Sequence, residues 1–94
     1  MSGDIAFVQP RILTKVDAAC SDCAGTDSVS AMVAIDPKGK VREVRTNNID
    51  LRGNEINQRT RQAVEAAVRR WRFAPATFKG SRVSDMLHVV VAVK

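Results

Sequence analysis

The chain has 94 residues, 45% of them hydrophobic and 4% aromatic, and its 15 Lys and Arg outnumber its 10 Asp and Glu, which gives a formal net charge of +5. This length supports one small core and excludes two independent ones, and the composition is globular rather than disordered. No window approaches the roughly 20 consecutive apolar residues of a transmembrane helix, and the amino end lacks a signal-peptide pattern. The positive charge permits attraction to nucleic acid, anionic lipid or cell-wall polymer and selects none of them.

The first segment, up to about residue 15, mixes apolar residues with Pro10. This pattern predicts an extended or short-helical lead-in that lies along the domain. Residues 16–27 are mostly small and turn-forming, which predicts a connector with room for one helical turn. We therefore divide the chain into a lead-in and connector, residues 1–27, and a domain, residues 28–94.

Two cysteines, Cys20 and Cys23, lie in the connector with the spacing found in zinc ribbons and redox-active sites. A closed zinc site needs four ligands, and the chain adds only His88 to the two cysteines, so no metal site is predicted. A redox enzyme is disfavoured because the motif precedes a strand instead of opening a helix after one. A local disulfide is favoured if the protein is exported, with inert thiols or an intermolecular metal or redox role as the alternatives.

A strand is predicted from Ser28 to Ile35, because the hydrophobic period there is two. The residues expected to face the core are Val29, Ala31, Val33 and Ile35.

A turn follows at residues 36–39, where Pro37 presets its own φ and Gly39 accepts a positive φ. The second strand of this hairpin should run from about Lys40 to Asn47. Its apolar residues Val41 and Val44 are three apart, which predicts either a bulge or an early end of the strand in the loop at residues 47–48. Its charges indicate a sheet edge.

A helix is predicted after Gly53, with Asn54 as its N-cap and an end near Arg72, three residues before Pro75. Its apolar face consists of Ile56, Thr60, Ala63, Val64, Ala67, Val68 and Trp71.

Residues 84–93 alternate again and predict the last strand. One face carries Leu87, Val89, Val91 and Val93, and the other carries Met86, His88, Val90 and Ala92. The expected fold is therefore α+β, with two layers: a three-stranded antiparallel sheet, made by a hairpin, a crossing helix and a returning strand, packed on one long helix.

No catalytic constellation is visible in the sequence. The chain has no Ser, His and acid set, no paired carboxylates and no Gly-rich phosphate loop, so neither an enzyme nor a cofactor is predicted. His88 is interpreted as a solvent-facing strand residue. Nucleic-acid binding is not expected either, because Trp71 falls on the apolar helix face and no other aromatic residue lies on the helix to stack on bases.

Residues 28–93 resemble the carboxy-terminal domain of the TonB family of energy transducers. The matching parts occur in order: the alternating strand, the Asp-x-x-Gly-x-Val turn at 36–41, the helix, the Trp-Arg-Phe-x-Pro-Ala motif at 71–76, Gly-x-x-Val at 80–83 and the final strand. The family's Tyr-Pro motif ahead of the first strand is absent, since the chain has no Tyr, and Ser28 stands where Gly is usual.

Four residues of these motifs have predicted scaffold roles. Trp71 is placed to fill the gap between helix and sheet, and Phe73 to anchor the chain after the helix. Pro75 prevents the helix from continuing, and Gly39 makes the hairpin turn.

The resemblance implies a periplasmic domain that binds the extended amino-terminal motif of a TonB-dependent outer-membrane transporter by strand addition and transmits energy for uptake. It also implies an inner-membrane anchor and motor proteins, both reached through a region absent from this chain. Carried onto this sequence, the contact segment is Asp85, Met86, Leu87, His88, Val89, Val90 and Val91. The alternative function is a stand-alone exported interaction or scaffold module, and the same edge could instead pair two copies in a homodimer.

Overall fold

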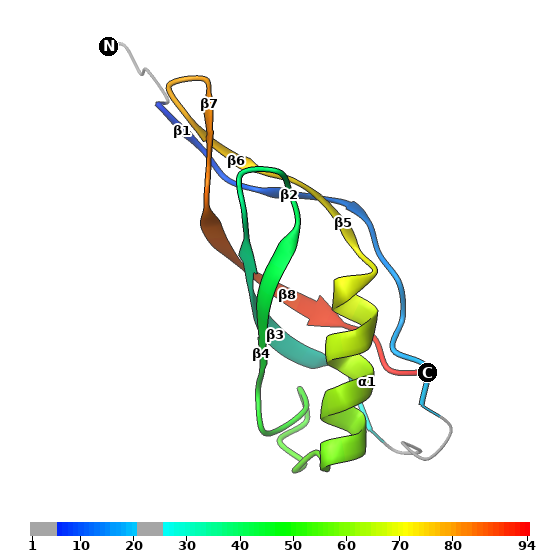
Figure 1. Ribbon diagram of the computed structural model, residues 1–94. Helices are drawn as coiled ribbons and strands as arrows, with labels where there is room; N and C mark the ends of the chain where they lie inside the picture. The colour runs from blue at the N-terminus through cyan, green and yellow to red at the C-terminus, as the bar shows by residue number, and fades with distance from the viewer. Residues whose placement is uncertain (1–5, 21–25) are drawn as a thin grey trace.

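The computed structural model describes residues 6–20 and 26–94. The strands are β1 (Phe7–Val8), β2 (Arg11–Thr14), β3 (Val29–Ile35), β4 (Val41–Thr46), β5 (Arg72–Ala74), β6 (Ala76–Phe78), β7 (Ser81–Val83) and β8 (Asp85–Val91), and the helix is α1 (Gln58–Arg69) (Figure 1). They form an α+β fold with three small antiparallel sheets, ordered β4-β3-β8, β2-β5 and β1-β6-β7.

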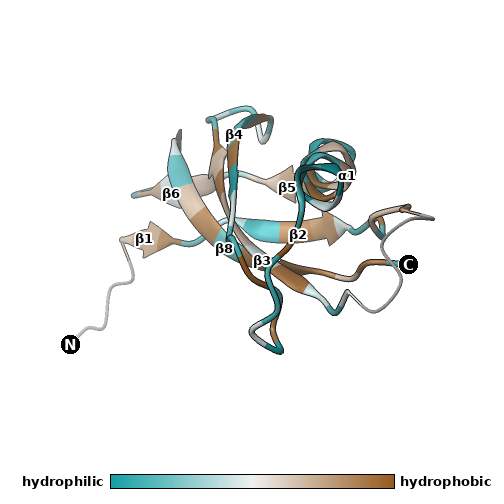
Figure 2. Cartoon of the chain, turned by 90° about the horizontal axis from the view of Figure 1, so that it is seen from below, coloured by the Kyte–Doolittle hydropathy of each residue, from teal (hydrophilic) through white to brown (hydrophobic). Residues whose placement is uncertain are grey.

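The central sheet, β4-β3-β8, contributes much of the core. All four residues of β3 that the sequence places inward are at most 2% exposed, which confirms the predicted strand and its register. They share one buried cluster with apolar residues of α1, β4 and β8, and Figure 2 shows the helix beside the hydrophobic stretches of these strands. The cluster includes Val29, Val33, Val44, Val64, Val68, Val89 and Val91.

The predicted hairpin between β3 and β4 is confirmed. Gly39 has a φ of +85°, and the pairing of β3 with β4 shifts register between Ala34 and Ile35, so the expected irregularity is present. β4 lies at an edge of the sheet, as its charges indicated.

The lead-in is extended rather than helical, and it forms strands that the sequence did not reveal. β2 pairs with β5, and β1 pairs with β6, so residues 7–14 run antiparallel to residues 72–78. A two-residue turn at Lys79 and Gly80, both with positive φ, then joins β6 to β7. These strands extend the molecule beyond the central sheet, and its overall dimensions are 50 × 24 × 17 Å (Figure 1).

The predicted start of the helix is wrong. Asn57, and not Asn54, is the N-cap: its side-chain oxygen accepts the backbone N–H of Thr60 at 2.8 Å. Asn54 lies three residues earlier in a loop held by the bridge between Ile49 and Glu55. This bridge keeps the chain extended until Ile56, so the helix cannot begin sooner.

The predicted end of the helix is also too late. Arg70 caps α1, and the N–H groups of Arg70 and Trp71 bond back to the last turn, while Arg72 already pairs with Thr14 in the neighbouring strand. α1 therefore has 12 residues and is not the long helix that we expected. It is too short to cross a membrane, and no helix in residues 6–20 and 26–94 could do so.

The motif residues after the helix meet the hairpin turn. Trp71 and Phe73 are 5% and 6% exposed, and their rings stack with centroids 6.1 Å apart. The Trp71 indole N–H donates to the Val16 carbonyl at 2.7 Å, which ties the connector to the helix end. A Cβ on Gly39 would lie 2.5 Å from the Phe73 carbonyl oxygen and 3.5 Å from Pro75, so this turn requires glycine for space as well as for φ.

Candidate strand-docking edge

The strand that the sequence singles out for partner contact lies at the edge of the central sheet. The seven predicted contact residues coincide with β8, which follows β3 at the end of the order β4-β3-β8. Its pairing with β3 is regular over seven residue pairs, from Val29–Val91 to Ile35–Asp85. One side of β8 is thus fully used for the ladder.

The direction of the backbone groups follows from the segment beyond β8. The Ala18 N–H donates to the Ala92 carbonyl at 2.8 Å, and the Lys94 N–H donates to the Ala18 carbonyl at 2.9 Å. Ala92 and Lys94 therefore direct their N–H and C=O groups away from β3. Because successive residues of a strand direct these groups to opposite sides, the outward residues of β8 are Met86, His88 and Val90.

The pairing of β3 with β4 identifies the same outward residues in β8. The Ser30 carbonyl accepts the Asn47 N–H at 3.0 Å. The N–H and C=O groups of even-numbered residues in β3 therefore point toward β4, and those of odd-numbered residues point toward β8. Odd residues of β3 stand opposite odd residues of β8, as with Ala31 and Val89. No turn, loop or terminal segment within the described ranges bonds to the outward groups of Met86, His88 and Val90.

The open edge has a defined end. Residues 18–20 lie beside residues 92–94 as a short parallel addition, with the Cys20 N–H donating to the Lys94 carbonyl at 3.0 Å. Ala18 is fully buried there. The connector therefore occupies the continuation of the edge, and within residues 6–20 and 26–94 no segment pairs with the outward side of β8 itself.

The side chains of the predicted contact segment divide into two groups. Met86 and Val90 are 47% and 44% exposed, and His88 is exposed between them, as the sequence indicated. Val89 and Val91 are buried in the core, so their side chains cannot meet a partner on the surface. The exposed group and the outward backbone groups belong to the same three residues.

A groove of about 730 Å³ lies where β8 begins. It separates the β3–β4 turn from the first residues of β8, and its walls combine an apolar base with charges of both signs. The lining residues are Ala34, Ile35, Asp36, Pro37, Lys38, Lys40, Arg42, Ser84, Asp85 and Met86. The Lys40 and Lys38 N–H groups and the nearby Arg42 lower the pKa of Asp36, so this acid stays ionised beside the cations.

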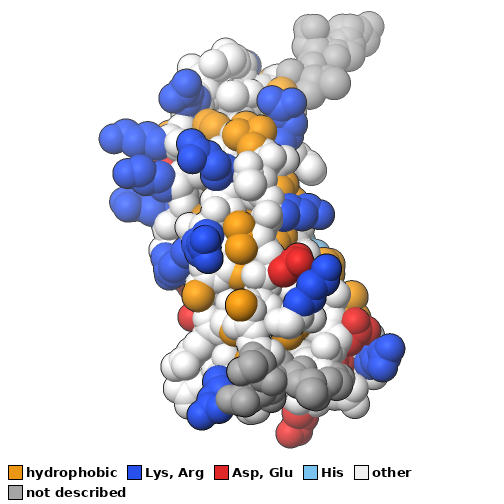
Figure 3. Space-filling view, turned by 90° about the vertical axis from the view of Figure 1, so that its right-hand side faces the viewer, with side chains coloured by type: hydrophobic (Ala, Val, Ile, Leu, Met, Phe, Trp, Pro, Cys, Tyr) orange, Lys and Arg blue, Asp and Glu red, His pale blue; other side chains and the backbone are white. Residues whose placement is uncertain are grey.

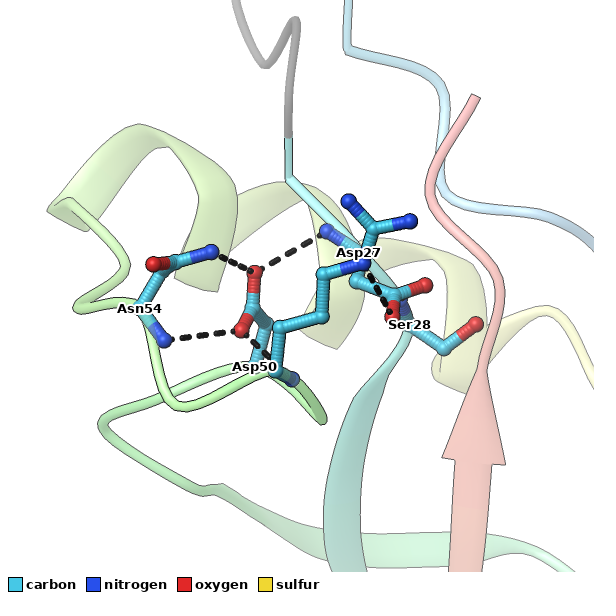
Figure 4. Close-up of polar contacts among 5 residues, drawn as sticks. Asp27, Ser28, Asp50 and Asn54 are labelled. Atoms are coloured by element: carbon cyan, nitrogen blue, oxygen red, sulfur yellow. Dashed lines mark hydrogen bonds and ion pairs between the residues drawn. The ribbon is translucent and has the colours of Figure 1, made fainter.

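A second polar cluster surrounds Asp50, which is 3% exposed (Figure 4). Its carboxylate accepts the backbone N–H groups of Asp27, Asn54 and Arg52 at 2.9–3.0 Å, and these bonds lower its pKa. Asp27 also pairs with Arg52. Since the carboxylate is already satisfied by backbone groups, this cluster holds the connector to the loop before α1 and is not a reactive site.

The connector cysteines are only partly described. Cys20 is disulfide-bonded, whereas Cys23 lies outside the described residues, so the Cys20–Cys23 pairing stays a prediction. Among the residues that the structure does describe, no group of three or more His, Cys, Asp or Glu could hold a metal ion.

Sequence reasoning found the strand but missed what limits it. Pairing between distant segments determines which three residues of β8 have outward backbone groups. It also places the connector at one end of the open edge and the groove at the other. The period of two in residues 84–93 was the only local signal.

Comparison of the chain with protein-family models, with curated proteins and with solved structures found no match. The resemblance to the TonB family therefore stays a prediction based on residues 28–93.

Proposed function

We propose that this protein is a strand-docking module, in which β8 accepts an extended segment of a partner protein as an additional strand. The observation that carries the proposal is the row of outward backbone groups at Met86, His88 and Val90, whose side chains are exposed as well. Main-chain bonds supply affinity in this mode of recognition, and alternate side chains supply selection. No side-chain catalyst takes part.

The size of the edge sets the length of the docked segment. Met86 and Val90 are four residues apart, which corresponds to about 13 Å at roughly 3.3 Å per residue. Ala18 blocks extension past Val91. The segment thus makes main-chain bonds over about five residues, and its end near Met86 reaches the groove with charges of both signs.

The sequence resemblance supplies the partner in this proposal. The docked segment is the amino-terminal motif of a TonB-dependent outer-membrane transporter, and the protein acts in the periplasm to transmit energy for uptake. Motor proteins of the inner membrane act through a region that precedes this domain in the full-length protein. The regular register of β3 with β8 supports this role, because a pull on the docked strand is shared among all bonds of the ladder.

The test is an amide-chemical-shift titration with peptides copied from the amino-terminal motifs of outer-membrane transporters from the same cell. We expect shifts to cluster on residues 84–93. After docking, hydrogen exchange should slow at Met86, His88 and Val90, because their N–H groups then gain acceptors. Leu87 and Val89 should change little, because their N–H groups already bond to β3.

Matched variants separate edge docking from surface charge. Val90→Lys adds one positive charge on the docking edge, whereas Glu43→Lys reverses a charge on exposed β4 and therefore changes the net charge more. We expect Val90→Lys to weaken peptide binding about tenfold, or 1.4 kcal/mol, and Glu43→Lys to change it far less. Equal effects of the two, or shifts that cluster on β4, would contradict the proposal.

A further outcome concerns a second copy of the chain. If β8 pairs with β8 of another molecule, the exchange protection of Met86, His88 and Val90 will rise with protein concentration in the absence of peptide. Protection that depends on peptide and not on protein concentration supports docking of a transporter segment.

A further inference from the structure

A basic pocket lies on the other side of the hairpin turn from the groove beside β8. Its volume is about 480 Å³, within the range of small-molecule sites. The residues that line it, which define the basic pocket hereafter, are Leu13, Lys38, Gly39, Lys40, Val41, Arg69, Trp71, Arg72 and Phe73.

Four of the residues that line the basic pocket are cationic, and they come from three separate elements. Lys38 and Lys40 come from the β3–β4 turn, Arg69 is the last residue of α1, and Arg72 is the first residue of β5. The negative end of the helix favours a cation at Arg69. No acidic residue lines the basic pocket.

Four acidic residues within the described ranges form ion pairs with cations outside the basic pocket. Ion pairs join Asp36 to Arg42, Glu43 to Arg45, Asp27 to Arg52, and Asp17 to Lys94. None of the four pocket cations forms an ion pair with a described acidic residue. Asp36 interacts electrostatically with Lys40, but no ion pair neutralises the basic pocket within the described ranges. The face of the molecule in Figure 3 also has many Lys and Arg side chains around small apolar patches.

The floor of the pocket is rigid and apolar. Trp71 and Phe73 are stacked and almost fully buried, Trp71 is held by its bond to the Val16 carbonyl, and Gly39 lies directly against the Phe73 backbone. Because the two rings are buried, they offer no free face on which a nucleobase could stack.

We infer that the basic pocket binds a compact ligand that carries two or more linked phosphate groups. Several phosphates on one small group place enough negative charge within 480 Å³ to meet four cations. Arginine binds phosphate through paired N–H donors and lysine as a point charge, so the mixture suits this ligand. An acidic peptide spreads its carboxylates along about 3.3 Å of chain per residue and fits so small a space less well.

This site is separate from the docking strand, although Lys38 and Lys40 line both the basic pocket and the groove beside β8, so its test uses Arg69 and Arg72, which do not line that groove. The basic pocket contains no residue of β8, and the outward groups of Met86, His88 and Val90 lie at the opposite edge of the sheet from β4. Either function can fail while the other stands.

The first experiment titrates the protein with inorganic tripolyphosphate in a calorimeter at low ionic strength. The variant Arg69→Gln/Arg72→Gln removes two cations that line only this pocket. The control, Lys79→Gln/Arg82→Gln, removes two cations from the exposed β6–β7 hairpin and changes the net charge equally. Circular dichroism spectra of all three proteins should coincide, because the four substituted residues are exposed.

We expect saturable binding that the pocket variant weakens roughly a hundredfold, about tenfold for each arginine removed, and that the control weakens only about twofold. Equal losses in both variants would overturn the site, because they would show diffuse attraction to the net charge. Absence of saturable binding by the unmodified protein would overturn it as well.

Two further arms identify the source of the phosphate. Sedimentation with vesicles that contain diacylglycerol diphosphate, a lipid whose headgroup has two linked phosphates, compared with neutral phosphatidylcholine vesicles, tests a lipid headgroup. Binding of tripolyphosphate that these vesicles do not displace supports a free ligand, and displacement supports the lipid. If poly-glutamate binds as tightly as tripolyphosphate and the pocket variant weakens both equally, the assignment to phosphate is wrong.

Discussion

The two edges of the central sheet differ in exposed charge, in register and in the extent of their contact with α1. β4 carries exposed charges at Arg42, Glu43 and Arg45, has an irregular register and lies against α1. β8 has a regular register, and its exposed residues include Met86 and Val90. Charges and irregularities are the usual means by which proteins protect a strand edge. β4 is therefore protected against further pairing, whereas no segment in the described part of the chain covers β8.

The largest expected effect is the difference in stability between proline variants whose lost N–H faces β3 and those whose lost N–H faces outward. Val89→Pro removes an N–H that faces β3 and a buried side chain, so we expect the free energy of unfolding to fall by about 3 kcal/mol or more. His88→Pro removes an N–H that faces outward, and proline is tolerated at such edge positions. Urea denaturation of both variants measures the difference. If His88→Pro is as destabilising as Val89→Pro, the assignment of outward residues is wrong.

The next effect concerns the turn that leads into the protected edge. Gly39→Ala strains a positive φ and forces a Cβ against the Phe73 carbonyl, so we expect a loss of roughly 2–3 kcal/mol. Gly80→Ala is the control, because Gly80 has a φ of +84° but no atom near its Cβ position, and it should cost only about 1 kcal/mol. Chemical denaturation would contradict this expectation if the two variants were equally stable.

A smaller effect should appear in the unmodified protein without any partner. Amide hydrogen exchange at Met86, His88 and Val90 should be at least about tenfold faster than at Leu87 and Val89, because only the latter two donate to β3. Mass spectrometry or NMR of the exchanging protein measures this alternation. Uniform protection along β8 at low protein concentration would show that another segment covers the edge.

The smallest effect is a decrease in the free energy of unfolding at acid pH, caused by protonation of Asp36 and Asp50. Hydrogen bonds lower the pKa of Asp36 and of Asp50 from 3.8 in the folded protein. Their ionised forms therefore stabilise the fold fully above pH 3.8, and this contribution disappears as the pH falls through the lower pKa of the folded state. Urea unfolding at neutral pH and below pH 3.8 measures it. In Asp36→Asn/Asp50→Asn the dependence on pH should be weaker, and an unchanged dependence would contradict this account.

Local patterns in the sequence were sufficient to predict the β3–β4 hairpin and the strand β8. The period of two identified the inward residues of β3, and the turn residues identified Gly39 with its positive φ. The apolar face of the helix was also correct, since Thr60, Val64 and Val68 are buried. Such features depend on neighbours within a few residues, which is why they can be read without a fold.

The boundaries of the helix and the pairing of the lead-in could not be obtained in this way. Asn54 and Asn57 are both good N-caps, and only the bridge between Ile49 and Glu55 decides between them. Residues 7–14 have no strong period of their own, and their partners lie more than 55 residues later. Distant pairing of this kind leaves no local signal.

The sequence by itself determined which residues alternate in β8, because side-chain direction in a strand follows residue parity. Only the tertiary structure decided that Met86, His88 and Val90 are also the residues whose backbone groups are open. That result depends on β3 on one side and on the bonds of Ala18 to Ala92 and Lys94 beyond the strand. The four cations of the basic pocket were likewise separate surface charges in the sequence, and packing of the turn against Phe73 brought them together.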